Sequence, residues 1–188
     1  MDDRTIPQLT NTSHHHSLSI RSDNIDLANV FKTWIETQHE YDTFIPKLAN
    51  TFRTYRNYEL KSSIIMLLTH LEKIAFTNNK SKKEKYDFPI IFYDRTNTKE
   101  TLEKLLETSS ETIGTKLSAL RGELAHIGQG KANILSTLPP LRLVGISICL
   151  DIIIATHIFT EMGISEAVIY EFQNHELEWP RLILESST

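Results

Sequence analysis

Residues 143–159, with the sequence LVGISICLDIIIATHIF, form a strongly apolar stretch late in the 188-residue chain. The stretch is shorter than the roughly 20 residues that are needed to span a bilayer. Asp151 and His157 interrupt it, and ionisable residues are costly in the middle of a membrane. We therefore expect a helix that is buried inside a protein core. Such a helix needs other apolar surfaces around it, and the rest of the sequence supplies them.

The ends of this helix are marked by proline and glycine. Pro139 and Pro140 suit the start of a helix, because a first-turn proline loses no hydrogen bond there. Gly163 suits the end, because glycine adopts the left-handed conformation that often terminates helices. The predicted helix therefore covers about 141–162.

Other segments of the chain show the periodicity of amphipathic helices. Asp26 is placed to cap one such helix. A longer helix is predicted over 58–76, where apolar residues recur at helical spacing: Leu60, Ile64, Leu67, Leu68, Leu71, Ile74 and Ala75. The charged run 80–85 predicts a loop after this helix.

The segments after this loop are less regular. Residues 88–92, FPIIF, contain Pro89 and are short, so we expect an extended connector packed on the helices. Thr98 or Thr101 is a candidate cap for the next helix, and Gly114 is expected to separate it from a following one. We find no alternating strand pattern.

These patterns predict an all-α protein, an antiparallel bundle of about five to six helices. We expect the helical domain to cover 23–166, with a C-terminal extension over 167–188. Residues 1–22 are polar and aperiodic, which predicts a flexible tail. The histidine triplet 14–16 has no other ligand cluster near it in sequence, so we predict neither a metal site nor a cofactor.

Charge and cysteine content narrow the possible functions. The net charge of -4 argues against a general polyanion binder, but it allows a local basic surface. Cys149 is the only cysteine in the sequence, so an internal disulfide is excluded. The first residues, MDDRTIPQLT, lack the basic and apolar regions of a signal peptide. We therefore expect a cytoplasmic protein without membrane association.

Residues 120–128, LRGELAHIG, place Arg121 and His126 five residues apart near a predicted helix end. At about 100° per residue the two side chains differ by about 140° around the helix, a gap that a long arginine can close. RNA carries its own nucleophile, the 2′-OH. A histidine can move the protons, and a guanidinium matches the charged phosphate. Spacing alone leaves an alternative, in which Arg121 is a surface residue paired with Glu123 or a neighbour.

The surroundings of this pair resemble the HEPN superfamily, whose motif is an arginine, a short run of residues and a histidine. LRGELAHIG matches that motif, and THLEKIAF (69–76) and EMGIS (161–165) resemble the ApeA-like branch of bacterial anti-phage defence proteins. The resemblance implies metal-independent endoribonuclease activity in defence or toxin systems, with Arg121 and His126 as catalytic residues. It also implies a homodimer that joins two such pairs in a cleft, an RNA substrate, and a cognate antitoxin or regulatory domain as a possible partner.

Gly122 departs from the family pattern, since many active members carry Asn, Asp or His directly after the motif arginine. A non-catalytic HEPN module that binds nucleic acid, a nucleotide or a partner protein is therefore the second hypothesis. The third is a plain helical interaction domain in which the Arg–His spacing is coincidental.

Six further residues complete the candidate site. Glu72 is expected to lean over the motif helix and hold Arg121, and Glu123 is a second supporting candidate. Four basic residues are candidates for RNA contact: Arg53, Arg56, Lys82 and Lys83. The first two alternate with aromatic residues, a pattern that suits base stacking, and the other two lie in the predicted basic loop. For Glu72 and the four basic residues a plain solvent-facing role is the alternative, whereas Glu123 would bring negative charge toward a phosphate.

Overall fold

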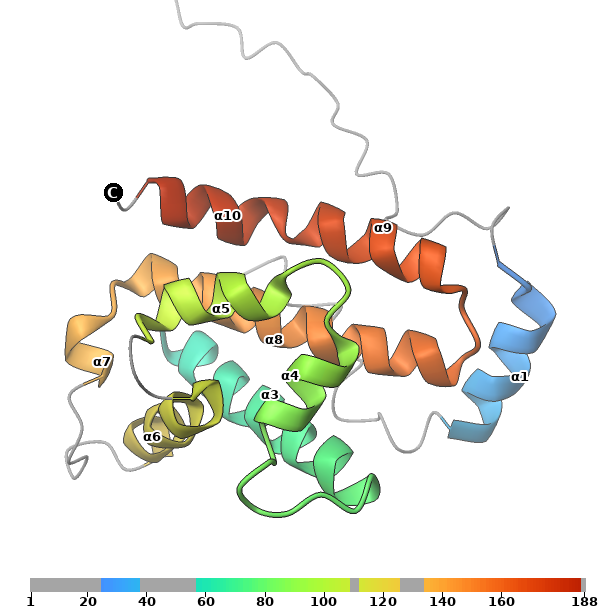
Figure 1. Ribbon diagram of the computed structural model, residues 1–188, viewed down its shortest axis with the longest axis horizontal. Coiled ribbons are helices and arrows are strands. Elements are labelled where there is room, and N and C mark those ends of the chain that lie inside the picture. The colour runs from blue at the N-terminus through green and yellow to red at the C-terminus, as the bar shows by residue number, and fades with distance from the viewer. Residues whose placement is uncertain (1–24, 38–56, 109–111, 126–133, 187–188) are drawn as a thin grey trace, which may run out of the picture.

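The computed structural model describes residues 25–37, 57–108, 112–125 and 134–186, and every regular element within these ranges is a helix (Figure 1). The predicted all-α helix bundle is thus confirmed. The expected tail over 1–22 lies outside the described residues. The helices are α1 (Leu27–Thr37), α3 (Asn57–Thr77), α4 (Asp87–Tyr93), α5 (Thr98–Leu106), α6 (Ile113–Ala125), α7 (Ile134–Thr137), α8 (Pro140–Glu161), α9 (Glu166–Glu176) and α10 (Glu178–Glu185).

Helix α8 begins and ends where the sequence predicts. Pro139 precedes the helix and Pro140 is its first residue. Gly163 has a φ of 73°, and its N–H donates to the carbonyl of Thr160 at 3.0 Å. The next N–H, that of Ile164, reaches back to the carbonyl of Phe159 at 3.0 Å. This pair of bonds is the glycine-dependent Schellman termination, which satisfies carbonyls at the helix end.

The first described helix, α1, begins as predicted. The carboxylate of Asp26 accepts the N–H of Asn29 at 3.2 Å and so caps the helix. Val30 and Trp34 pack against the core, whereas the opposite face of the helix stays exposed.

The segment 88–92 is helical, so the expected extended connector is wrong. Pro89 is the third residue of α4, in the first turn, where a missing N–H is tolerated. Ile90 and Tyr93 are both buried. Their separation of three residues puts them on one face of a helix, whereas an extended chain would point them to opposite sides.

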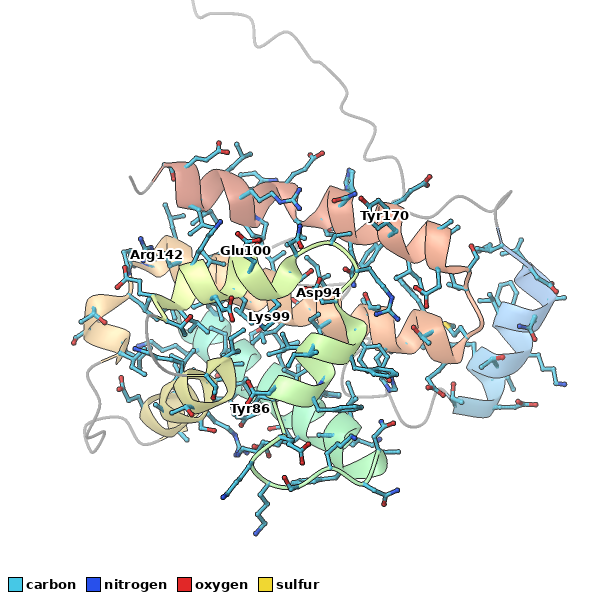
Figure 2. The ribbon with its side chains drawn as sticks, in the orientation of Figure 1. Tyr86, Asp94, Lys99, Glu100, Arg142 and Tyr170 are labelled. Carbon is cyan, nitrogen blue, oxygen red and sulfur yellow. The ribbon has the colours of Figure 1, made fainter. Side chains whose placement is uncertain are left out.

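The start of α5 is capped by Asp94, which local sequence patterns do not single out. The carboxylate of Asp94 accepts the N–H of Thr98 at 2.9 Å and that of Lys99 at 3.1 Å. In Figure 2 the labelled Asp94 lies beside the start of this helix, where Lys99 is also labelled. Thr98 and Thr101 lie inside the helix, so neither predicted cap is correct. The residue directly before the helix, Asn97, turns the chain with a φ of 69°.

Gly114 does not separate two helices but is the second residue of α6. Its N–H donates to the carboxylate of Asp87 at 2.9 Å. A Cβ at this position would lie 2.3 Å from that carboxylate, so only glycine allows this close approach. The acidic side chain from the start of α4 therefore satisfies an unpaired N–H in the first turn of α6.

The predicted C-terminal extension is part of the bundle, because α9 and α10 pack along α8 (Figure 1). The buried amide of Gln173 ties α9 to the chain around α4 and α5. Its Nε2 donates to the carbonyl of Tyr93 and to the hydroxyl of Thr156, both at 2.7 Å. Its Oε1 accepts the N–H of Arg95 at 2.8 Å and the hydroxyl of Thr96 at 3.1 Å. Although most of α9 is polar, Val168, Ile169 and Gln173 form a narrow buried face on it.

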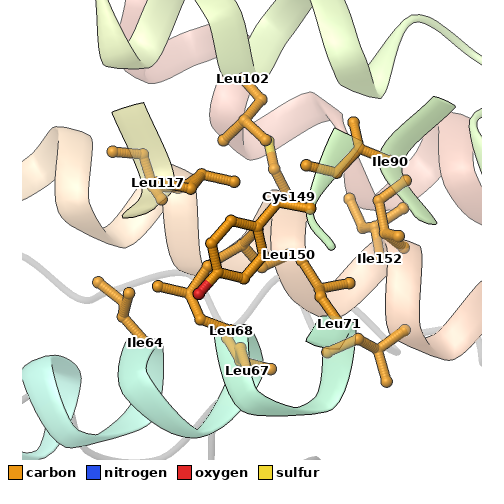
Figure 3. Packing of buried hydrophobic residues seen from close by; sticks show 14 of the residues in the cluster. Ile64, Leu67, Leu68, Leu71, Ile90, Leu102, Leu117, Cys149, Leu150 and Ile152 are labelled. Carbon is orange, nitrogen blue, oxygen red and sulfur yellow. The ribbon is translucent and has the colours of Figure 1, made fainter. Parts of the chain in front are cut away.

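The core is built around α8, on which α3, α4, α5, α9 and α10 all pack. Between residues 143 and 160 no residue of this helix is exposed. By length and composition α8 could cross a membrane, but 72% of its most apolar stretch of 18 residues is buried inside the fold. Figure 3 shows its buried side chains Cys149 and Leu150 among side chains of α3, α4, α5 and α6, including Ile64, Leu67, Leu68, Leu71, Ile90, Leu102 and Leu117. The predicted buried helix is confirmed.

The Gln173 network predicts that this one amide supports the C-terminal helices. Gln173→Leu should lower the free energy of unfolding by about 2–4 kcal/mol, because buried backbone groups near α4 lose their partners. Urea denaturation followed by circular dichroism measures the change. Glu171→Leu, at an exposed position of the same helix, is the matched control and should change stability by less than about 0.5 kcal/mol. Equal unfolding midpoints for wild type and Gln173→Leu would show that the network contributes nothing.

Candidate functional site

One carboxylate oxygen of Glu72, on α3, accepts hydrogen bonds from three side chains that lie in two other parts of the chain. Its Oε1 accepts hydrogen bonds from Lys85 Nζ at 2.6 Å, from Tyr86 Oη at 2.6 Å and from Arg121 Nη1 at 3.0 Å. Lys85 and Tyr86 lie directly before α4, and Arg121 lies on α6. Tyr86 is labelled in Figure 2. We call these four residues the Glu72 cluster. The predicted contact between Glu72 and Arg121 is present.

The donors around Glu72 stabilise its ionised form. Burial alone would raise the pKa of this carboxyl, but the hydrogen bonds from Lys85 and Tyr86 and the charges of Lys85 and Arg121 lower it below its ordinary value. Burial and the adjacent Glu72 carboxylate raise the pKa of Tyr86, which therefore remains a protonated donor. With two cations and one carboxylate, the cluster carries one net positive charge.

Arg121 is held at the border between core and solvent. Leu117, Leu120 and Leu124 of the same helix are buried and anchor α6 on α3. Arg121 follows Leu120, so its side chain leaves the buried face and 35% of it stays exposed. A guanidinium has five N–H donors in a planar fork. Arg121 can therefore bind a phosphate while Glu72 fixes its position.

Glu123 serves the fold and does not face Arg121. The side chain is buried, and its two oxygens accept the N–H of Ile134 at 2.9 Å and of Leu135 at 2.8 Å. It thereby caps the start of α7. The contacts of Glu123 are thus with the backbone at the start of α7, and its supporting role at the candidate site stays a prediction. The alternative pairing of Arg121 with Glu123 is absent, because the partner of Arg121 is Glu72.

Gly122 has no packing role. A Cβ built at this position would meet no atom within 4 Å. Unlike Gly114, it could be replaced by a larger residue without a clash. Lack of space therefore does not explain why a glycine stands here.

The predicted basic loop follows α3, and its lysines have different roles. Lys82 and Lys83 are exposed, as RNA-contacting residues must be. Lys85, from the same loop, turns inward to Glu72. Lys85 and Tyr86 were not predicted as members of the site, because no spacing rule links a loop residue to a helix residue 13 positions earlier.

Three predicted site residues, His126, Arg53 and Arg56, lie outside the described residues. Within the described ranges, no group of three or more His, Cys, Asp and Glu side chains is placed to hold a metal ion.

Comparison with protein-family models, with curated proteins and with solved structures finds no match to this chain. The chemistry of the site therefore has to be argued from its own residues. Among the described residues, the Glu72 cluster brings together Arg121, a predicted catalytic residue, and Glu72, its predicted supporting residue.

The lowered pKa of Glu72 predicts a pH-dependent contribution to stability. A carboxyl with a depressed pKa stabilises the fold fully above its unfolded pKa, near the ordinary value of 4.5, and loses this contribution as the pH falls through the folded pKa. Glu72→Gln should therefore cost about 1–3 kcal/mol at pH 7, as expected for the loss of charge-assisted hydrogen bonds. The difference from wild type should shrink steadily below about pH 4.5.

Urea unfolding of both proteins at several pH values between neutral and acidic measures this difference. Glu171→Gln, at an exposed position of α9, controls for the loss of a carboxylate elsewhere. A difference between Glu72→Gln and wild type that stays constant with pH would contradict the assigned role of the charge.

Proposed function

We propose that the protein is a metal-independent endoribonuclease of the HEPN type, in which Arg121 binds the scissile phosphate and His126 transfers protons. The observation that supports this most directly is the placement of Arg121, whose guanidinium is hydrogen-bonded to Glu72 while 35% of the whole side chain stays exposed. A fixed and accessible guanidinium is the group that can stabilise charge on a phosphate in a transition state. His126 follows five residues later in the chain.

The proposed reaction uses the nucleophile that RNA carries. The 2′-OH gives its proton to a base and attacks the neighbouring phosphorus. The bond from phosphorus to the 5′-oxygen breaks, and that oxygen takes up a proton. The products are a 2′,3′-cyclic phosphate and a 5′-OH end. DNA lacks the 2′-OH and cannot react in this way. His126 supplies the proton transfers, because the ordinary pKa of imidazole lies near neutral pH.

In this proposal Glu72 is a positioning residue, since it contacts Arg121 and not the substrate. Lys85 adds a second positive charge next to the same oxygen. This surplus charge favours a phosphate dianion or diester over a neutral ligand. The same proposal includes a homodimer that brings two Arg–His pairs together. It also includes a role in anti-phage defence or as a toxin in the cytoplasm, and control by an antitoxin or regulatory domain.

A second candidate function is a non-catalytic module that binds nucleic acid, a nucleotide or a partner protein. Gly122 favours it, because the residue after Arg121 brings no polar side chain to the site. The open space at Gly122 makes this alternative testable by substitution.

An RNA cleavage assay in EDTA tests the proposal. Wild type should cut a single-stranded RNA and leave 2′,3′-cyclic phosphate ends, whereas DNA of the same sequence stays intact. Arg121→Ala and His126→Ala should each slow cleavage by about 100-fold or more, since a proton-transfer group or a phosphate-binding donor commonly contributes that much. His175→Ala, at an exposed position of α9, is the control for loss of an imidazole. Circular dichroism confirms that each variant is folded.

Gly122→Asn separates the two candidate functions. If the protein is an active nuclease, this variant should fold and cleave at least as fast as wild type. RNA that stays intact with wild type and is cut by Gly122→Asn would identify a lapsed nuclease and support the binding module. RNA that stays intact with both proteins would overturn the proposed activity.

A further inference from the structure

A basic and aromatic surface lies where the loop after α3 joins α4. The rings of Phe88 and Phe92 stack at a centroid distance of 5.2 Å with an angle of 24° between their planes. Phe92 is 52% exposed, so part of its ring is accessible. Tyr93 closes the side of Phe92 with an edge contact at 4.9 Å. The ring of Phe92 is thus held rigidly while part of it faces solvent.

One lysine lies on this ring pair, and two exposed lysines follow it closely in the chain. The ammonium of Lys80 lies 4.6 Å from the centroid of the Phe88 ring. Segment 80–85, KSKKEK, holds four lysines and one glutamate, a net charge of +3 on a chain whose total is -4. The carboxylate of Glu84 is turned onto Ser81, with a bond of 2.6 Å to the hydroxyl. Without Lys85, which is paired with Glu72, residues 80–84 still carry three lysines and one glutamate, a net charge of +2 directly before α4.

The combination of a supported ring and adjacent lysines distinguishes between possible ligands. A protein surface of ordinary apolar character would gain little from several lysines next to the contact. An unpaired nucleic-acid strand offers flat base faces and regularly spaced phosphates, which match a ring and cations respectively. Duplex RNA hides its base faces inside the helix.

We propose that Phe92, backed by Phe88, stacks an unpaired base of single-stranded RNA while Lys80, Lys82 and Lys83 contact the flanking phosphates. We call these five residues the α4 platform. The inference rests on the proposed function for the choice of RNA, and it deepens that function by naming the unpaired strand as the form that is bound.

The α4 platform and the Glu72 cluster share one short loop. Lys80 lies at its start, over Phe88, and Lys85 lies at its end, bonded to Glu72. Through Glu72 the loop is linked to Arg121. A strand that stacks on Phe92 and follows the lysines is therefore led toward the side of the bundle where the guanidinium of Arg121 is accessible.

Binding of a short fluorescein-labelled oligouridine, measured by fluorescence anisotropy, tests the proposal. The full chain with His126→Ala serves as the background, so that cleavage does not disturb the measurement. Phe92→Ala should weaken binding by about 5- to 100-fold, the range for loss of one stacked base. Phe92→Leu, which keeps apolar bulk without a ring, should weaken it similarly, and Phe92→Trp should preserve it. Phe31→Ala, at a 62% exposed phenylalanine on α1, is the matched control and should bind like the parent.

The lysines are tested by salt dependence. Lys82→Glu with Lys83→Glu should reduce the slope of log affinity against log salt by about 0.7 for each phosphate that the variant no longer neutralises. Lys32→Glu, an exposed lysine beside Phe31, should leave the slope unchanged. A duplex of the same length should bind more weakly than the single strand, because it offers no base face to Phe92.

Several results would overturn the platform. One is an equal affinity for RNA in folded Phe92→Ala and in its parent. Another is a shift from dimer to monomer in Phe92→Ala with unchanged RNA binding, which would assign the surface to a second copy of the chain. If wild type cleaves RNA and Phe92→Ala binds it normally, the α4 platform is wrong and the proposed nuclease activity stands. If binding depends on the Phe92 ring but wild type does not cleave RNA, the nuclease activity is wrong and the α4 platform stands.

Discussion

The helix α8 has to be enclosed, because its apolar residues occur around its whole circumference. No residue between 143 and 160 is exposed, so helices must cover it on every side. Removing so much apolar surface from water is the main favourable contribution to folding. α3, α4, α5, α9 and α10 provide the cover. The place of α3 against α8 in turn fixes Glu72, on the edge of α3 where α6 and the following loop meet.

Acidic side chains join the helices that surround α8. Asp94 holds the start of α5, Asp87 the start of α6 and Glu123 the start of α7. Each satisfies backbone N–H groups that a helix leaves unpaired in its first turn. Glu72 differs, since it accepts only side-chain donors. Because these carboxylates are engaged internally, an acidic chain can still present an exposed basic loop.

Sequence periodicity could predict the elements that bury a broad apolar face. α1, α3 and α8 were identified in this way, and glycine and proline chemistry placed both ends of α8. The contact between Glu72 and Arg121 was also among the expectations, with a solvent-facing Glu72 as the alternative. Arg121 lies near the end of a helix, as predicted, whereas the catalytic roles of Arg121 and His126 stay predictions.

The remaining features depend on side-chain contacts that helical periodicity does not predict. Asp94 caps a helix that starts four residues later, beyond the usual cap position. Gln173 fixes α9 through partners about 80 residues earlier, which no local pattern reveals. The segment 88–92 is helical, with Ile90 and the following Tyr93 facing one core, although its proline and short length suggested an extended connector.

The geometry of the site depends on the interaction between Glu72 and Arg121, and a double-mutant cycle measures it most directly. The cycle compares the free energies of unfolding of wild type, Glu72→Gln, Arg121→Gln and the double variant at pH 7. If Glu72 holds Arg121 in place, the two substitutions should be non-additive, with a coupling of about 0.5–3 kcal/mol. Additive effects, with a coupling near zero, would contradict the claim that this carboxylate positions the arginine.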